Sequence, residues 1–220
     1  MYEISKFSTV NIREYLAESK DAEIGEDVLL RIFSDFSCPI NPDVEQFLKE
    51  RAIEFTKKNQ SVTYLVISSD DGELLGYFTI AVKPITVNAD NFSGTVRRKI
   101  SRVSELDEAS HSYNLSAYLI AQIGKNYTEG LNNRITGKEL LELAIDQVKD
   151  LQYQAGGMVI FLEAENKKPL MKFYQDENNF KMFSTRESKS AVNEPHTLVQ
   201  LLKNHCRTER ETMCKGLESI

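Results

Sequence analysis

The chain has 220 residues, 41% of them hydrophobic and 27% charged, which is typical of one ordinary globular domain with decorations. Its formal net charge of −6 disfavours a general attraction to nucleic acid or anionic membranes, and only a local basic patch stays compatible with it. No apolar run approaches the roughly 20 residues that span a bilayer. Residues 1–6 lack the apolar core of a signal peptide. We therefore expect a cytoplasmic protein that does not bind membranes.

The three cysteines are Cys38, Cys206 and Cys214. An odd count at wide spacing disfavours a disulfide framework and favours a reducing compartment. His205 lies next to Cys206, but this spacing matches no known ligand pattern. We expect no metal.

Two elements are predicted at the start of the chain. Residues 28–33 form a short apolar run that we interpret as a strand. A helix is predicted over residues 41–58, because Asn41 can cap it, Pro42 suits the first turn and apolar residues follow at helical spacing.

An antiparallel hairpin is predicted next, over residues 61–69 and 74–82, joined by a turn that contains Asp71 and Gly72. Lys83 and Pro84 should end its second strand. Residues 85–113 then lose any clear period, which predicts an insertion, a lid or a solvated excursion with a short helix. This segment carries the basic cluster Arg97, Arg98, Lys99 and Arg102.

The second half alternates between strands and helices. Apolar runs over residues 117–123 and 158–164 predict two buried strands, joined by a helix that starts at Gly137 and ends near Gly156. A strand, a helix and a second strand imply a parallel crossover. A further helix is predicted from Lys168 to Tyr174, and residues 180–184 and 197–203 can pair as final strands. The fold class is therefore α/β with a mixed sheet flanked by helices, in a single domain over residues 1–203 that is followed by a tail over 204–220.

The loop before Gly137 ends at a helix start, where backbone N–H groups can hold an anion. Residues 132–137 (Asn-Asn-Arg-Ile-Thr-Gly) resemble the Gln/Arg-x-x-Gly-x-Gly/Ala pattern of the GNAT superfamily of acyl-CoA N-acyltransferases. Asn132 replaces the leading Gln or Arg, Ile135 replaces the first Gly, and Gly137 matches the last.

Two further stretches resemble the same superfamily over residues 28–203. The segment from Phe173 to Phe180 is similar to its Phe-Tyr-x-x-x-Gly-Phe signature, one residue longer and with Asn179 in place of the glycine. Asn tolerates the left-handed backbone that this position implies. Residues 36–66 are similar to the small toxin-type GNAT proteins that act on charged tRNA, with Pro39 in place of a glycine.

The resemblance implies acetyl-CoA as the co-substrate. We expect its pyrophosphate at the loop and helix start, and its pantetheine arm along the backbone of the strand before them. The implied cofactor-binding residues are Gln122, Ile123, Gly124, Arg134, Ile135, Thr136, Gly137, Lys138 and Asn166. Strict register places Lys167, rather than Asn166, at the last of these positions.

Acetyl transfer to an amine needs a proton acceptor and a group that protonates the leaving thiolate. The resemblance gives Tyr174 the second role. Glu163 and Glu165 lie on one face at the end of the second buried strand and are candidates for the first, with Glu163 preferred. A water chain is the alternative base.

The sequence predicts an acetyl-CoA-dependent N-acetyltransferase and leaves its amine acceptor open among small molecules, peptides or proteins, and aminoacyl-tRNA. One alternative is a catalytically degenerate GNAT-fold binding or regulatory module, which the departures at Asn132 and Ile135 favour. Another is a toxin-type acetyltransferase of charged tRNA, the one case in which nucleic acid is a partner. A homodimer is left open.

Overall fold

The structure is a computed structural model that describes residues 5–16, 25–188 and 197–204. Its strands are β1 (Phe7–Asn11), β2 (Val62–Ser68), β3 (Leu74–Asn88), β4 (Leu106–Asp107), β5 (Ser112–Lys125), β6 (Val159–Glu165), β7 (Lys181–Glu187) and β8 (Thr197–Asn204). Its helices are α1 (Arg13–Leu16), α2 (Glu26–Ser34), α3 (Pro42–Glu50), α4 (Ala52–Lys57), α5 (Gly94–Ile100), α6 (Gly137–Ala155) and α7 (Lys168–Met171). Short 3-10 turns η1 (Ala89–Asn91) and η2 (Thr128–Asn133) and the π-helical segment η3 (Lys172–Glu177) complete the described elements.

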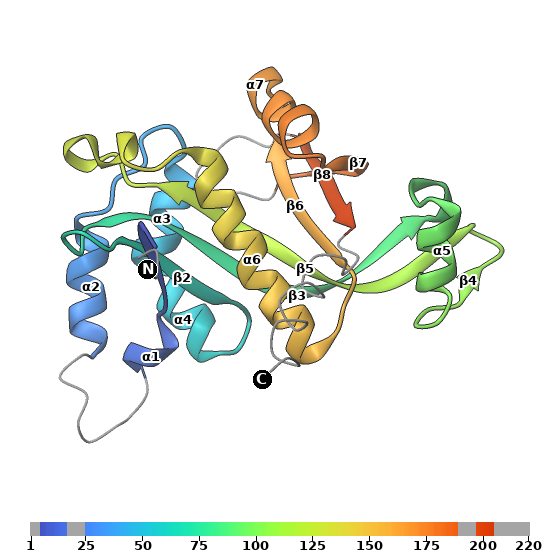
Figure 1. Ribbon diagram of the computed structural model, residues 1–220, viewed down its shortest axis with the longest axis horizontal. Helices are drawn as coiled ribbons and strands as arrows, with labels where there is room; N and C mark the ends of the chain where they lie inside the picture. Colours follow the sequence, from blue (N-terminus) through green and yellow to red (C-terminus); the bar gives the residue numbers. More distant parts are fainter. Residues whose placement is uncertain (1–4, 17–24, 189–196, 205–220) are drawn as a thin grey trace, which may run out of the picture.

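All eight strands belong to one mixed sheet, with the order β1-β2-β3-β5-β6-β8-β7 and with β4 paired to β5. The pair β5–β6 is parallel, as the strand-helix-strand pattern predicts, and the other described pairs are antiparallel. Figure 1 shows α6 crossing one face of the sheet while α3 and α4 lie behind it. The mixed α/β fold is therefore confirmed.

Two cores lie on the two faces of the sheet, and β3 contributes side chains to both, with an irregularity in its pairing with β2 at Leu75. Phe78 and Ile80 pack with the apolar face of α6, whose buried residues are Leu140, Leu141, Ala144, Ile145 and Val148. Tyr77 and Leu74 pack on the other face with α2 and α3. The apolar stripe of α6 follows the spacing that its sequence predicts.

The strand predicted over residues 28–33 is wrong, because this run forms most of α2. Leu29 and Phe33, one helical turn apart, are buried, whereas Leu30 is 45% exposed. Glu26 and Asp27 occupy the first turn, where negative charge stabilises a helix. A six-residue apolar run does not by itself distinguish a strand from one face of a helix. The edge strand β1 lies in a polar segment where no strand was predicted.

The second strand of the hairpin does not end at Pro84, because β3 continues to Asn88. Its pairing with β2 stops at Ile80. No other described strand pairs with β3 on that side beyond this residue, and an edge of this kind tolerates a proline without an N–H group. The ends of β3 and β5 form a two-stranded arm that carries α5 and projects away from the rest of the molecule (Figure 1). The range 85–113 is therefore a structured arm, and the short helix that one of the interpretations included is α5. Its own apolar cluster includes Val87, Phe92 and Ile100.

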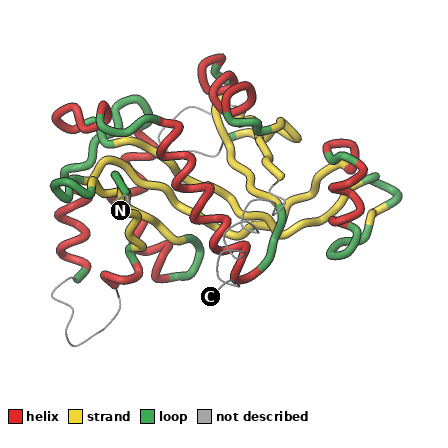
Figure 2. Tube along the Cα trace, viewed as in Figure 1, coloured by secondary structure: helices red, strands yellow, loops and turns green. Residues whose placement is uncertain are grey.

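The remaining predicted elements are present with adjusted ends. The helix predicted over 41–58 is divided into α3 and α4 at Arg51. The helix predicted from Lys168 continues through α7 into η3, and β7 and β8 pair antiparallel. Figure 2 shows this alternation of helices and strands along the trace. His205, Cys206, Cys214 and nearly all of the predicted tail lie outside the described residues.

Candidate active site

A single extra residue in β5 opens the sheet at its centre. Thr79 of β3 pairs with Gln122, and the next residue, Ile80, pairs with Ile120, so Ala121 has no partner on β3. A bulge of this kind bends the strand that carries it. The parallel ladder between β5 and β6 accordingly stops at the pair Ile120–Leu162. Beyond these residues the two strands separate.

A cleft of about 530 Å³ occupies this separation. It is lined by residues 120–125 of β5, by residues 162–165 of β6, and by Gly137 and Leu140 of α6. Gln122, Ile123 and Gly124, which were predicted to bind the cofactor, are half-buried along its wall. Because β6 no longer pairs with β5 here, residues 121–125 of β5 have no ladder partner on the β6 side among the described strands.

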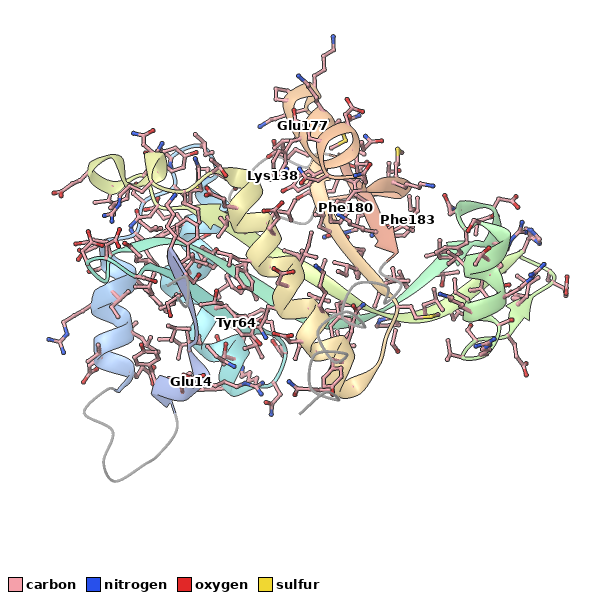
Figure 3. All side chains as sticks on the ribbon, in the orientation of Figure 1. Glu14, Tyr64, Lys138, Glu177, Phe180 and Phe183 are labelled. Atoms are coloured by element: carbon pink, nitrogen blue, oxygen red, sulfur yellow. The ribbon has the colours of Figure 1, made fainter. Side chains whose placement is uncertain are left out.

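The start of α6 forms the end of the cleft nearest to α7. Thr136 caps the helix by accepting a hydrogen bond from the Glu139 amide at 3.1 Å, and the Glu139 carboxylate accepts one from the Thr136 amide at 2.7 Å. The amides of Gly137 and Lys138 have no recorded partner in the described part of the chain. Figure 3 shows Lys138 at the α6 end nearest to the segment that carries Glu177 and Phe180.

Arg134 and Ile135 do not line the cleft. The guanidinium of Arg134 donates to both carboxylate oxygens of Asp71, at 2.8 and 3.0 Å, and to Ser68 Oγ at 2.9 Å. These bonds lower the pKa of Asp71 to about 2. Ile135 is 1% exposed in the core under α6. The side chains of this loop therefore anchor it to the β2–β3 hairpin and do not reach the cleft.

Tyr174 lies in the wall of the cleft on η3 and is 9% exposed. Its ring packs against Phe173 and Phe180, with centroids 5.0 and 6.0 Å away. Its hydroxyl has no hydrogen-bond partner recorded among the described residues. Burial raises the pKa of Tyr174 to about 12, so the phenol is protonated at neutral pH.

The segment that follows Tyr174 turns as the sequence predicts. Asn179 has a φ of 57°, in the left-handed region, and the Phe180 amide donates to the Tyr174 carbonyl at 2.9 Å. This turn brings Phe180 back against the Tyr174 ring.

Glu163 lies in the cleft wall in a charged pair. Arg186 of β7 donates from Nε to Oε1 at 2.6 Å and from its second nitrogen to Oε2, and Gln200 donates to Oε1 at 2.8 Å. Partial burial raises the pKa of the carboxyl group, but the bonds from Arg186 and Gln200 outweigh it, so the pKa lies below its usual range. Glu165 pairs with Lys167.

Asn166 is exposed and does not line the cleft, whereas its neighbour Lys167 does. Strict register with the GNAT signature also places Lys167, rather than Asn166, at this position.

Sequence reasoning missed the wall that α3 contributes. Cys38, Asp43 and Val44 line the cleft opposite β6. The buried Tyr77 hydroxyl donates to the Val44 carbonyl at 2.5 Å and holds the start of α3 against the sheet. The sequence signal was Gly124, since a glycine inside a strand often marks a close approach of another element.

No described helix is long and apolar enough to cross a membrane. No group of three or more His, Cys, Asp or Glu side chains that could hold a metal occurs in ranges 5–16, 25–188 and 197–204.

Comparison with known proteins finds no matching family model and no matching curated sequence, but many solved structures match. AtaT complexed with acetyl-methionyl-tRNAfMet is 14% identical, with a TM-score of 0.56 over 95% of this chain and 99% of that one. A tyrosine-to-phenylalanine mutant of KacT is 16% identical, with a TM-score of 0.57 over 91% and 95%. AtaTR bound with AcCoA is 14% identical, with a TM-score of 0.51 over 90% and 93%. Together with the mixed sheet and its central opening, these matches show that the chain has a GNAT-type fold, similar to the fold of AtaT and KacT.

Proposed function

We propose that this protein is an N-acetyltransferase that transfers an acetyl group from acetyl-CoA to an amine by direct attack. The observation that carries the proposal is the opening between β5 and β6 with Tyr174 in its wall, a residue whose hydroxyl has no hydrogen-bond partner within the described ranges. Two similar structures support the proposal. AtaTR is bound with AcCoA, and AtaT is complexed with acetyl-methionyl-tRNAfMet.

The donor binds in two parts in this proposal. The pantetheine arm of acetyl-CoA carries amides and lies along residues 121–125 of β5. No described strand pairs with these residues on the β6 side, so their backbone groups can pair with the arm as a strand would. The pyrophosphate approaches the amides of Gly137 and Lys138 at the start of α6. Of the loop residues predicted for this role, Thr136 contributes through helix capping, and Arg134 and Ile135 contribute by positioning the loop.

The reaction forms a C–N bond between the acceptor and the acetyl carbon and breaks the C–S bond of the thioester. The amine loses a proton and the departing sulfur gains one. Tyr174 donates a hydrogen bond to this sulfur as negative charge develops on it. Its pKa of about 12 keeps it protonated until the C–S bond breaks. Desolvation makes the thiolate in the same buried site more basic, so the thiolate takes the phenol proton, and the phenolate then regains a proton from water.

Glu163 is the proposed proton acceptor in the cleft. It is ionised at neutral pH, as a base must be, but the hydrogen bonds from Arg186 reduce its basicity. Within this proposal the pair with Arg186 sets the pH at which Glu163 can accept a proton. A water chain from the cleft is the alternative acceptor.

A toxin-type acetyltransferase of charged tRNA is a narrower version of the same proposal. It is favoured by the similarity to AtaT complexed with acetyl-methionyl-tRNAfMet. The basic residues Arg97, Arg98 and Arg102 lie on and just after α5, on the projecting arm. Acceptor screening separates this version from acetylation of small amines or peptides.

The test is release of free thiol from acetyl-CoA by the full chain, with small amines, peptides and aminoacyl-tRNA as acceptors. Tyr174→Phe should lower kcat by roughly 10²-fold or more, as expected for loss of an acid or hydrogen-bond donor to the leaving group. Tyr153→Phe, at an exposed position of α6 outside the cleft, should leave the rate unchanged. Binding of acetyl-CoA without thiol release for any acceptor would favour the degenerate binding module instead.

A further inference from the structure

The turn after Tyr174 is closed by hydrogen bonds from a side chain and from the backbone. Tyr174 lies in the π-helical segment η3, in which hydrogen bonds join residues five apart, one more than in an α-helix. This geometry accommodates the one residue by which the segment exceeds the GNAT signature. The buried side chain of Asn178 donates from Nδ2 to the Phe173 carbonyl at 2.8 Å, and the Phe180 amide donates to the Tyr174 carbonyl at 2.9 Å.

Lys203 of β8 holds the same turn from outside it. Its Nζ donates to the Asn178 carbonyl at 2.9 Å and lies 5.5 Å from the centroid of the Phe180 ring. Leu201, two residues earlier and therefore on the same face of β8, packs in the core that includes Tyr174. Lys203 thus extends a core-facing row of β8 and ends it with an amine bound to the turn.

An amine is costly at this position. Partial burial lowers the pKa of Lys203, and the positive charge of Lys149 lowers it further, whereas Glu142 raises it. No carboxylate forms an ion pair with Lys203 among the described residues. An apolar side chain of the same length would avoid the cost of burying the charge, so the contribution of Lys203 lies in its contacts with the turn.

The position of the Tyr174 hydroxyl depends on this turn. The hydroxyl has no hydrogen-bond partner within the described ranges, so its place is set by the backbone of η3 and by the rings of Phe173 and Phe180 that pack on it. Asn178 is bonded to the first of these residues, and Lys203 lies over the ring of the second. A shift of the turn therefore moves the phenol within the cleft wall.

We propose that Asn178 and Lys203 are positioning residues for Tyr174, which hold the turn after η3 and thereby fix the phenol hydroxyl at the leaving sulfur. Neither residue is part of the cleft lining, so both act through Tyr174. This inference rests on the proposed function, in that Tyr174 serves the sulfur of the thioester.

The kinetic test is thiol release from acetyl-CoA by variants of the full chain. Lys203→Met keeps a long apolar side chain and removes the donor, and kcat should fall about tenfold because a misplaced group slows the chemical step. KM for acetyl-CoA should stay within about twofold, since the change affects the transition state rather than donor binding. Asn178→Asp, which keeps the shape and replaces the donating amide with an oxygen, should give the same loss. Lys181→Met, at an exposed position of β7, is the matched control and should change neither constant.

Two further readouts separate positioning from a general effect on stability. In a Tyr174→Phe background neither variant should lower kcat further, because effects that act through one hydroxyl do not add. Nitration of Tyr174 by tetranitromethane, followed by mass spectrometry, needs no catalysis. At about pH 8, Lys203→Met should raise its rate about tenfold, as expected if exposure lowers the phenol pKa by about one unit towards its ordinary value. Tyr153, which is exposed, is the reference in the same digest.

Three results would overturn the inference: a wild-type kcat in both variants, an equal loss of kcat in the Tyr174→Phe background, or an unchanged nitration rate of Tyr174. If Lys203→Met does not fold, Asn178→Asp carries every one of these comparisons. If the wild type releases no thiol with any acceptor, the proposed function fails, and the nitration rates alone decide whether Asn178 and Lys203 hold the ring.

Discussion

Val44 Cγ1 lies 2.5 Å from the point that a Cβ atom on Gly124 would occupy. Helix α3 therefore touches the backbone of β5 beside the cleft, and only glycine leaves room for this contact. Gly124→Ala should lower the free energy of unfolding by about 1–3 kcal/mol, because the added methyl overpacks a filled contact. Gly94→Ala is the matched control, since nothing lies within 4 Å of a Cβ there. Urea unfolding of both variants checks this, and equal stabilities would contradict the contact.

The buried phenol of Tyr174 predicts a pH-dependent difference in stability. Its pKa is about 12 in the folded protein, against about 10 when unfolded, so folding favours the protonated form. The resulting stability is fully present below pH 10 and is lost as the pH rises towards 12. Over this window the wild type should lose about 3 kcal/mol more than Tyr174→Phe. Other tyrosines titrate in both proteins, so the difference between the two unfolding curves is the measurement. Parallel curves would show that Tyr174 is not desolvated.

The Glu163–Arg186 pair predicts a shift in the pH profile of catalysis. Arg186→Gln removes the opposite charge that lowers the pKa of Glu163, so the acidic limb of kcat/KM should move to higher pH. Glu163→Gln should abolish this limb and lower kcat by roughly 10²-fold or more. Because the pKa of Glu163 lies below the ordinary value of about 4.3, rates must be measured from roughly pH 3 to pH 9 to decide this. An unchanged limb in both variants would assign proton removal to water.

The left-handed turn at Asn179 predicts that alanine and glycine at this position have different effects on stability. Asn179→Ala should destabilise the fold by about 1 kcal/mol, because alanine gains nothing from a positive φ. Asn179→Gly should be neutral or slightly stabilising, since glycine adopts this backbone freely. Thermal unfolding compares them. If alanine were tolerated as well as glycine, the turn would carry no strain.

Much of the fold could be predicted because its signals are local. Helical spacing of apolar residues predicts α6, and an Asp-Gly turn predicts the β2–β3 hairpin. Two apolar runs predict β5 and β6. The run at residues 28–33 has no such local signal. Its helical character depends on which of its side chains pack against the sheet, and the sequence of the run alone does not show this. β3 passes Pro84 because β2 ends at Ile80, and that fact belongs to pairing between distant segments.

The site divides in the same way. Gln122, Ile123, Gly124, Gly137 and Tyr174 line the cleft, because strand order and helix start place them there, and their roles in binding and catalysis stay predictions. The destination of the Arg134 side chain was not predictable, since its partner Asp71 lies 63 residues away in the chain. The partner of Glu163 was missed for the same reason, because Arg186 is 23 residues away on β7.

Ala121 has no partner on β3, and the cleft therefore depends on the number of residues in β5 as well as on their side chains. β5 uses one residue more than β3 over the same stretch of ladder, and the parallel ladder with β6 ends there. A chain shortened by this one residue could continue the ladder to β6 and close the entrance with every lining side chain still encoded. A comparison of related sheets by substitutions alone therefore misses one way in which this cleft can form or close. Single-residue insertions and deletions in β5 must be compared as well.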